Sequence, residues 1–306
     1  MALLENGEIV EARIRLDGVL AAGSVLPARL TSIGSGGRNA VATDERGREY
    51  LLPRGAPGIT EGAGLAIEIV REVIPGTEPW KRPLARLTEK RPHLPPPLDQ
   101  FPGGATLDLP AAADALGNAG WNDLLEEARS GIVRFAGGEL RISPTPAMTL
   151  IDVDGHLPPD ELAVTGAMEG ARAVRRLGIG GSIGIDLPTA GSKAARQQAA
   201  AAIDATLPQP FERTAVNGFG FVQIVRPRPR ASLVEHAQDR AAFEARALLR
   251  LAVFEPPGAK RLVAHPAVAG AVERGWIDAL ARQIGGAVEL RADASLPMSG
   301  GYAEPL

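Results

Sequence analysis

The sequence predicts an α+β protein of several domains: an N-terminal β domain, a central α/β domain and a small C-terminal α/β domain. Short apolar runs separated by Gly, Asp and Pro turns fill residues 1–75, and a proline-rich tract follows. Beyond residue 131, segments with strand-like and helix-like patterns alternate, as in an α/β domain. A chain of 306 residues fits two or three domains, because domains usually contain about 100–200 residues.

Composition narrows the classes of function. The chain is 45% hydrophobic but only 4% aromatic, so we expect an aliphatic core. A net charge of −3 excludes a uniformly basic coat, although a local basic face is enough to attract phosphates. The absence of cysteine excludes disulfides, thiolate zinc sites and cysteine nucleophiles, and with four histidines we expect no structural zinc.

The location of the protein is predicted from two absences. The first residues show no basic start followed by an apolar run, which a signal peptide would need. No stretch reaches the ~18 uninterrupted apolar residues of a membrane span. We therefore expect a cytoplasmic protein with no membrane partner.

The N-terminal segment is predicted to be β-structure. Leu3–Val10 contains an Asn6-Gly7 turn between two apolar runs, a strong hairpin signal. About five short strands at this spacing favour a small closed barrel, with any other small β domain as the alternative. The further strands expected are Val25–Ile33, Asn39–Thr43, Glu49–Leu52 and Leu65–Val73.

The next segment separates the β domain from the rest. Lys90–Gly104 is rich in proline, which removes backbone donors and favours extended geometry, so we expect a linker. A single modest helix is predicted at about Leu107–Ser130. The expected boundaries are 1–89 for the β domain, 90–130 for the linker and a reduced insert, 131–234 for the central domain and 235–306 for the C-terminal domain.

The central and C-terminal segments alternate between strands and helices. The central strands are so apolar that we expect them to be covered on both faces of their sheet. The central elements expected are a hairpin at Val133–Ile142, strands at Ala147–Val153 and Ser182–Leu187, helices at Leu162–Leu177 and Lys193–Leu207, and a strand or hairpin at Thr214–Val225. Those of the C-terminal unit are Ala237–Phe254, Pro266–Glu273 and Trp276–Ile284 as helices, with Arg261–Ala264 and Ala287–Ala292 as strands.

Two predicted strands end on carboxylates, Asp152 and Asp186. A carboxylate at the end of a buried strand is poorly solvated unless it is paired. Because one helix joins the two strands, they are expected to be neighbours and to present both carboxylates to one divalent cation. Mg²⁺ fits such a site, because it binds through one or two carboxylates, waters and substrate phosphates. The alternative is that both residues simply cap loops.

Basic and aromatic residues follow in the same region. Arg226, Arg228 and Arg230 alternate with prolines, and Phe219 and Phe221 precede them. Arginine binds phosphates bidentately and aromatic rings stack on unpaired bases. The arginines are therefore either phosphate contacts or a solvated face, and the two phenylalanines are either base-stacking or core residues. The helix that carries Arg172, Arg175 and Arg176 is expected to add charge close to the metal site.

The order and spacing of these blocks resemble the ribonuclease E/G family. The resemblance covers most of the chain and is weakest at residues 90–130. The segments that carry it are Val133–Ile142, Pro144–Gly155, Ala171–Thr189, Lys193–Gln197 and Val216–Arg230, with Ile59–Gly76 in the N-terminal part and the C-terminal unit up to Tyr302.

The resemblance implies a fold and an activity. The fold would be an OB-like RNA-binding barrel, a DNase I-like catalytic domain and a small C-terminal domain, through which a homodimer could form. The activity would be Mg²⁺-dependent (alternatively Mn²⁺-dependent) endonucleolytic cleavage of single-stranded RNA such as rRNA or mRNA, leaving a 5′-phosphate and a 3′-hydroxyl. Asp152 and Asp186 would hold the metal and Asp154 would orient or assist the attacking water. The expected RNA contacts are Tyr50, Arg172, Arg176, Lys193, Arg196, Phe219, Arg226, Arg228 and Arg230.

The sequence also departs from the family pattern. Pro146 replaces a usual acidic residue and Gly218 replaces a usual arginine. The cysteine pair that shares zinc between protomers is absent, as is any match to the pocket that senses a 5′-monophosphate. Pro146 and Gly218 motivate one alternative, an RNA-binding or regulatory protein that has kept the fold and lost efficient cleavage. A separate alternative is a metal phosphodiesterase for a small nucleotide, which would need a closed pocket.

Overall fold

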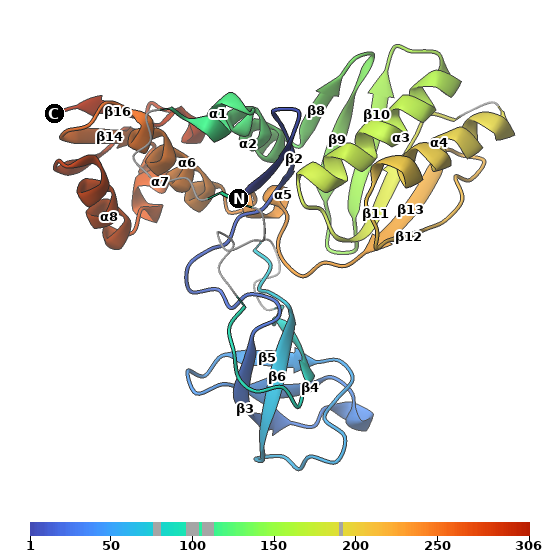
Figure 1. The fold of residues 1–306 in the computed structure, drawn as a ribbon, viewed down its shortest axis with the longest axis horizontal. Coiled ribbons are helices and arrows are strands. Elements are labelled where there is room, and N and C mark those ends of the chain that lie inside the picture. The colour runs from blue at the N-terminus through green and yellow to red at the C-terminus, as the bar shows by residue number, and fades with distance from the viewer. Residues whose placement is uncertain (76–80, 96–103, 106–112, 190–191) are drawn as a thin grey trace.

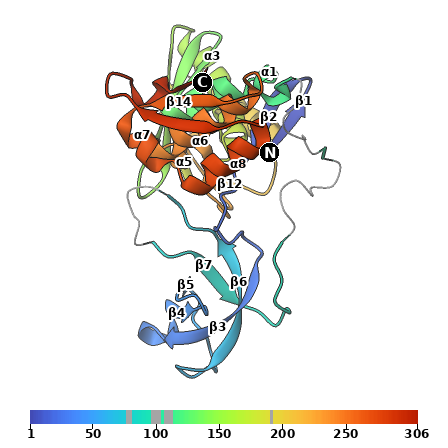
Figure 2. The ribbon, with the colours of Figure 1, turned by 90° about the vertical axis from the view of Figure 1, so that its left-hand side faces the viewer.

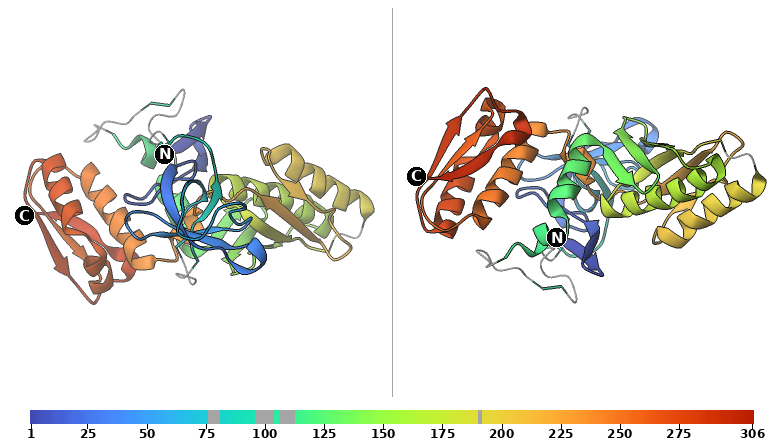
Figure 3. Two further views of the ribbon diagram at one scale, coloured as in Figure 1. Left: turned by 90° about the horizontal axis from the view of Figure 1, so that it is seen from below. Right: turned by 90° about the horizontal axis from the view of Figure 1, so that it is seen from above.

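The computed structural model describes residues 1–75, 81–95, 104–105, 113–189 and 192–306, and shows an α+β chain arranged in three lobes. A β-barrel lies below the other two lobes in Figure 1, and the view at right angles in Figure 2 shows it equally separate. Seen from above in Figure 3, the C-terminal lobe lies at one end and the central sheet at the other. The mixed α+β class predicted from the sequence is confirmed.

The barrel is closed by five strands in the order β3-β4-β5-β7-β6. Its interior is aliphatic apart from Tyr50, whose side chain lies among Leu30, Leu52 and Ile67. The predicted barrel is thus confirmed, but its fifth strand is β7 and not the N-terminal hairpin. The strands are β3 (Val25–Ser32), β4 (Ala40–Thr43), β5 (Glu49–Leu52), β6 (Gly64–Arg71) and β7 (Leu84–Leu87), with a 3₁₀ turn, η1, at Ser35–Gly37.

The N-terminal hairpin belongs to the central lobe. It consists of β1 (Ala2–Glu5) and β2 (Glu8–Ala12), joined by a turn in which Asn6 and Gly7 have φ of 53° and 85°. These positive φ values fit the tight turn that an Asn-Gly pair favours. Ile9 and Ala12 are buried in the central core, so the hairpin is held by packing rather than by a sheet partner.

The central lobe is built on a six-stranded sheet. The strands β10 and β11 are parallel and are joined by α3, whereas the other pairs are antiparallel. A crossover of this kind needs a helix, because parallel neighbours cannot be joined by a tight turn. In spatial order the strands are β12 (Glu212–Arg213), β13 (Phe221–Arg226), β11 (Gly181–Asp186), β10 (Thr149–Gly155), β9 (Gly138–Pro144) and β8 (Ile132–Phe135).

Two helices, α3 (Pro159–Arg176) and α4 (Lys193–Thr206), lie over the same face of this sheet in Figure 1. Acidic residues in the first turn of α3 and arginines in its last turn complement the helix dipole. Gly166 of α3 lies so close to β10 that an added Cβ would be 2.4 Å from Val153 Cγ1. On the other face, Leu150 is 38% exposed, so the expectation that the strands are covered on both faces is wrong for β10.

The segment before the central sheet forms two helices, α1 (Ala115–Asn118) and α2 (Trp121–Ser130), rather than one. The chain breaks at Gly120, whose φ is 92°, a left-handed conformation that glycine adopts readily. The predicted start at Leu107 lies outside the described residues. Trp121, Leu124 and Leu125 are buried in the central core, so α2 is part of this lobe and not of a linker.

The C-terminal lobe has a three-stranded sheet in the order β15-β14-β16 and its own core, which includes Leu248, Leu262 and Ile284. A short helix, α5, precedes it and is buried with the central core. The elements are α5 (Leu233–His236), α6 (Arg240–Phe254), β14 (Lys260–Ala264), α7 (Pro266–Ala271), α8 (Arg274–Ile284), β15 (Val288–Ala292), the 3₁₀ turn η3 (Met298–Gly300) and β16 (Tyr302–Pro305).

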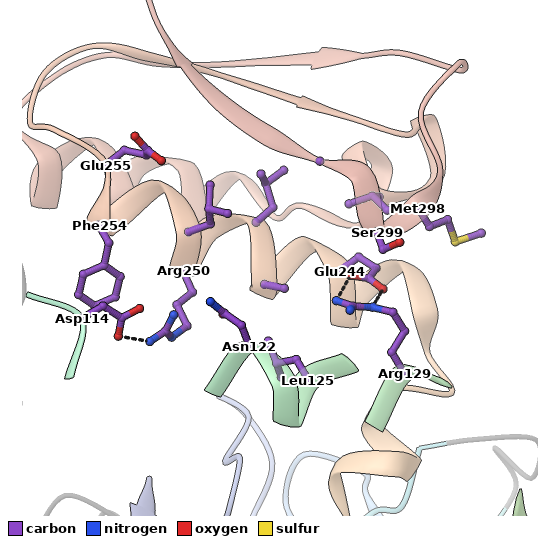
Figure 4. Close-up of a pocket in the computed structure, with 15 residues that line it drawn as sticks. Asp114, Asn122, Leu125, Arg129, Glu244, Arg250, Phe254, Glu255, Met298 and Ser299 are labelled. Atoms are coloured by element: carbon purple, nitrogen blue, oxygen red, sulfur yellow. Dashed lines mark hydrogen bonds and ion pairs between the residues drawn. The ribbon is translucent and has the colours of Figure 1, made fainter. Parts of the chain in front are cut away.

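Helix α6 joins the central and C-terminal lobes. Phe243 near its start is buried in the central core, whereas Ala245, Leu248 and Ala252 are buried in the C-terminal core. Between α2 and α6 lies a cavity of about 300 Å³, with an Arg129–Glu244 pair at one end in Figure 4. The cores therefore divide the chain differently from the predicted boundaries at residues 130 and 234.

One finding bears on membranes. Within the described ranges, no helix combines the length and the apolar character needed to cross a bilayer.

Candidate active site

Asp152 and Asp186 lie side by side on neighbouring strands. The parallel pairing of β10 and β11 puts these two residues directly opposite each other. Their side chains leave the same face of the sheet, because each lies next to a buried residue, Ile151 or Ile185, that points to the helix-covered face. Sequence spacing suggested that the two strands were neighbours, and the register brings the two carboxylates together.

Asp154 joins them on the same face. It lies two residues beyond Asp152 on β10, and the side chains of a strand return to the same face with a period of two. All three aspartates are exposed, whereas Val153, between Asp152 and Asp154, is buried. The three predicted catalytic residues therefore share one open surface, which we call the carboxylate face.

The carboxylates influence each other electrostatically. Partial burial raises the pKa of Asp152, and the negative charges of Asp154 and Asp186 raise the same pKa further. The positive charge of Arg141 opposes this shift. Mutual repulsion of this kind is expected where carboxylates crowd together, and a cation bound among them would relieve it.

Arg141 is a site residue that the sequence reasoning missed. It lies directly opposite Asp152 in the β9–β10 pairing and its guanidinium Nη2 is 2.8 Å from Glu139 Oε1. The signal was available, because alternation in the predicted hairpin puts Arg141 on the face opposite the buried Leu140 and Ile142. The pairing register with Asp152 could not be read from the sequence alone.

Phe221 and Gln223 form the other side of the carboxylate face. Phe221 pairs with Asp186, and its ring lies over Gly184, where an added Cβ would come within 2.6 Å of the ring. Gln223 Nε2 donates to Ser182 Oγ at 2.9 Å. Phe221 was expected to be either a core residue or a base-stacking residue. Its ring is half-buried and lies beside the carboxylate of Asp186, so neither description fits it fully.

The donor set suits Mg²⁺ but supplies few ligands. Among the described residues, no group of three or more His, Cys, Asp or Glu side chains is close enough to hold a metal ion. Two carboxylates are sufficient for Mg²⁺, which usually keeps several waters and shares substrate phosphates. Asp152 and Asp186 therefore suit an ion that is held weakly and whose remaining ligands are waters and substrate phosphates. They do not suit a structural metal site, in which the protein supplies all the ligands.

A groove lies along α4, one of the two helices that cover the face of the sheet opposite the carboxylates. It has a volume of about 510 Å³, and its lining includes Lys193, Arg196 and Gly218. The turn that contains Gly218 is held against the end of β11, because Leu187 N donates to Gly220 O at 3.2 Å. The groove therefore begins near the end of β11, the strand whose last residue is Asp186.

Phe219 stands at the tip of the same turn. Its side chain is 82% exposed, although Phe is usually buried. Asn217 Oδ1 accepts hydrogen bonds from Phe219 N and Phe221 N, at 2.9 and 3.0 Å, and so fixes the turn. Core packing is excluded for Phe219, and its ring is available for stacking.

Arg172 and Arg176 are not close to the carboxylates. They belong to α3, which packs on the opposite face of the sheet through Gly166 and Gly170. Arg172 pairs with Glu169, and Arg176 pairs with Glu127 of α2 at 2.8 Å. The expectation that this helix adds charge near the metal site is wrong, because a helix that covers one face cannot reach the other.

Arg226, Arg228 and Arg230 also lie away from the carboxylates. Arg226 pairs with Gly181 at the start of β11, whereas Asp186 ends this strand. All three are half-buried near the barrel, and Arg228 forms an ion pair with Glu235. The three arginines were predicted to be either phosphate contacts or a solvated face. They are neither fully solvated nor beside the proposed metal site. Glu72 N donates to Pro229 O at 2.8 Å, so this segment contacts the chain directly after the barrel strand β6.

Tyr50 is a core residue of the barrel. Its side chain is 2% exposed and its hydroxyl donates to Asp44 Oδ2 at 2.9 Å. A buried ring cannot stack on a base, so the predicted role of Tyr50 in RNA contact is wrong.

Comparison with known proteins adds no family. No protein-family model matches the chain, and no curated protein gives a significant match. The resemblance to the ribonuclease E/G family therefore stays a prediction.

Proposed function

We propose that the protein is a metal-dependent endoribonuclease that hydrolyses single-stranded RNA, such as rRNA or mRNA. One observation carries the proposal: the in-register pair of Asp152 and Asp186 on an open sheet face. The face is open, and a groove that contains Lys193 and Arg196 begins near the end of β11, on the side of the sheet that α4 covers. An extended strand can follow such a surface, whereas a small nucleotide would favour the closed pocket expected of a phosphodiesterase.

Asp152 and Asp186 would hold Mg²⁺, or Mn²⁺, through carboxylate oxygens. When bound, the ion would supply Lewis-acid stabilisation of charge on the phosphate oxygens and help to ionise water. Asp154, two residues from Asp152, is in reach of the same surface and would accept a hydrogen bond from the attacking water. Arg141, opposite Asp152, would stabilise the negative charge that develops on the phosphate.

The reaction is a hydrolysis. The water oxygen bonds to phosphorus, the bond from phosphorus to O3′ breaks, and a proton passes to O3′. The products are one strand with a 5′-phosphate and one with a 3′-hydroxyl. Lys193, Arg196 and Phe219 would hold the strand through its phosphates and a stacked base.

The second candidate is an RNA-binding protein that cuts slowly or not at all. Gly218 favours it, since the arginine that the family resemblance implies there is missing, and an added Cβ would meet nothing within 4 Å. Pro146 does not favour this candidate, because it lies in the turn before β10. This turn is at least about 10 Å from Asp152, since β10 begins three residues before Asp152 and a strand rises about 3.3 Å per residue.

Incubation of a 5′-labelled single-stranded RNA with the protein separates the two candidates. The nuclease proposal predicts Mg²⁺-dependent fragments with 3′-hydroxyl ends, and no cutting of the same sequence in a duplex. RNA binding without fragments, with Mg²⁺ or Mn²⁺ alike, would favour the binding protein.

A further inference from the structure

The groove along α4 has a chemical order that runs from cationic to apolar to hydrogen-bonding. Its α4 wall consists of residues spaced as one helical face: Lys193, Arg196, Gln197, Ala200, Ala201 and Asp204. The opposite wall is part of the segment 213–218. The groove follows three helical turns, about 16 Å at 1.5 Å per residue.

The first part of the groove attracts anions. Lys193 is exposed and forms no ion pair within the described part of the chain, and Arg196 lies one turn further along α4. Arginine and lysine at this spacing match the oxygens of a phosphate. Among the residues that the structure describes, no carboxylate lines the groove between these two residues and Asp204.

The middle part is apolar. Ala200 is 9% exposed and Val216 is 8% exposed, so both are firmly packed and form an apolar floor. Alanine leaves room above this floor that a larger side chain would fill. A planar ring can lie on such a surface, and the volume of about 510 Å³ falls in the range of ligand pockets.

The far end offers donors and acceptors. Arg213 Nε donates to Asp204 Oδ1 at 2.8 Å, and both residues line the groove. The polar atoms of such an ion pair can bind the polar edge of a ring. The groove therefore matches a phosphate, a planar apolar body and a hydrogen-bonding edge, in that order.

We propose that this groove is a nucleotide subsite, with the phosphate at Lys193 and Arg196 and the base on Ala200, Ala201 and Val216. The inference rests on the proposed function in one respect: the nucleotide would be an unpaired residue of the RNA strand next to the cleaved bond. A free nucleotide has the same chemistry, so the test distinguishes the two sources.

The test measures binding of a nucleoside 5′-monophosphate, a 5′-phosphorylated trinucleotide and inorganic phosphate in buffer that contains EDTA. Ala201→Trp fills the groove, and Lys193→Gln removes the cation. Gln198→Trp is the control, because it adds the same ring at an exposed position of α4 that does not line the groove. We expect Ala201→Trp and Lys193→Gln to weaken nucleotide binding at least tenfold and Gln198→Trp to change it less than twofold.

The source of the nucleotide follows from the relative affinities. Tighter binding of the trinucleotide than of the monophosphate identifies a strand, and the reverse identifies a free nucleotide. The proposal is overturned if the wild type binds no nucleotide at millimolar concentration, if phosphate binds as tightly, or if Lys193→Gln and a folded Ala201→Trp both bind like the control. Because metal is absent, nucleotide binding can succeed while RNA cleavage fails, which would overturn the proposed function alone.

Discussion

Asp152 is next to Asp186 because two strands are parallel and in register, not because their residues are close in the chain. Because side chains alternate along β10, Asp154 lies on the same face as Asp152. Arg141 lies opposite Asp152 on the partner strand β9. A single residue shift of β11 would turn Asp186 towards α3 and α4. The site therefore depends on individual residues at fixed strand positions, and its predictions concern single side chains.

Gly218→Arg should strengthen RNA binding. The position has open space around an added Cβ and its φ lies outside the positive region, so arginine fits without strain. One new phosphate contact should raise affinity at least threefold and steepen the log–log salt dependence by about 0.7. Gly275→Arg adds the same charge at an open position on α8 and is expected to leave both quantities unchanged. Equal effects of the two variants would mean that net charge alone is responsible.

His236 should make the fold sensitive to acid. Burial, and then the charge of Arg246, lowers its pKa to about 4. The unfolded chain, with a histidine pKa of about 6.5, binds the proton more readily, so stability falls as the pH drops from about 6.5 to 4. The full loss is about 3 kcal/mol, from 1.36 kcal/mol for each pKa unit.

Chemical denaturation at pH 7.5 and 4.5 measures this effect. His236→Gln should lose about 2.5 kcal/mol less than the wild type over this interval, because the full loss is reached only below pH 4. His156→Gln removes an exposed histidine and should keep the wild-type profile. If the His236 and His156 variants respond alike to pH, the buried histidine is not the cause.

The sequence predicted that Asp152 and Asp186 lie near strand ends, but it did not predict which other side chains lie near them. Arg172 and Arg176 lie on the face opposite the carboxylates, because the face that a helix covers depends on tertiary packing. Tyr50 was misjudged because the barrel closes around it. Arg141 was missed because its partner is set by the pairing register.

At the scale of elements, the contact of α3 with β10 is so close that it requires a glycine. Gly166→Ala would normally favour a helix by about 1 kcal/mol, but its Cβ would lie 2.4 Å from Val153 Cγ1. Overpacking costs about 1–3 kcal/mol, so we expect a net destabilisation of about 1 kcal/mol. Gly270→Ala in α7 meets nothing within 4 Å and should be neutral or stabilising. Thermal unfolding of both variants tests this; a more stable Gly166→Ala would contradict the packing.

The pairing of α2 with α6 depends on a buried ion pair. Arg129 Nε and Nη2 donate to the two carboxylate oxygens of Glu244 at 2.6 and 2.9 Å, and the Glu244 side chain is 3% exposed. Glu244→Ala leaves Arg129 buried without this partner and should lower the free energy of unfolding by about 3–5 kcal/mol. Glu126 also pairs with Arg129 but is 62% exposed, so Glu126→Ala should cost less than about 1 kcal/mol. Similar losses for both variants, measured by denaturant titration, would contradict the account.

Most elements could be predicted because their signals are local. The Asn6-Gly7 turn, the helix α4 and the strand β11 follow from turn chemistry and apolar pattern. The assignment of elements to lobes could not be predicted in this way. The hairpin β1–β2 joins the central core and β7 closes the barrel, since both depend on contacts between distant segments.

At the scale of the whole molecule, the barrel lies apart from a body in which α6 connects the central and C-terminal cores. The barrel is tied to this body near Arg226–Arg230, through the hydrogen bond of Glu72 N to Pro229 O. The carboxylate face and the α4 groove both belong to the central lobe. Any catalysis should therefore depend on this lobe and on the two aspartates that face each other in it.

The most direct test is cleavage of a labelled single-stranded RNA with Mg²⁺ by the wild type and by folded Asp152→Asn and Asp186→Asn variants. Asp278→Asn, an exposed aspartate on α8, is the matched control. The account predicts that either site substitution removes about 10³-fold of the activity, or about 4 kcal/mol of transition-state stabilisation, while the control cuts like the wild type. Wild-type cleavage that survives in both site variants would contradict the assignment of the carboxylate pair as the catalytic centre.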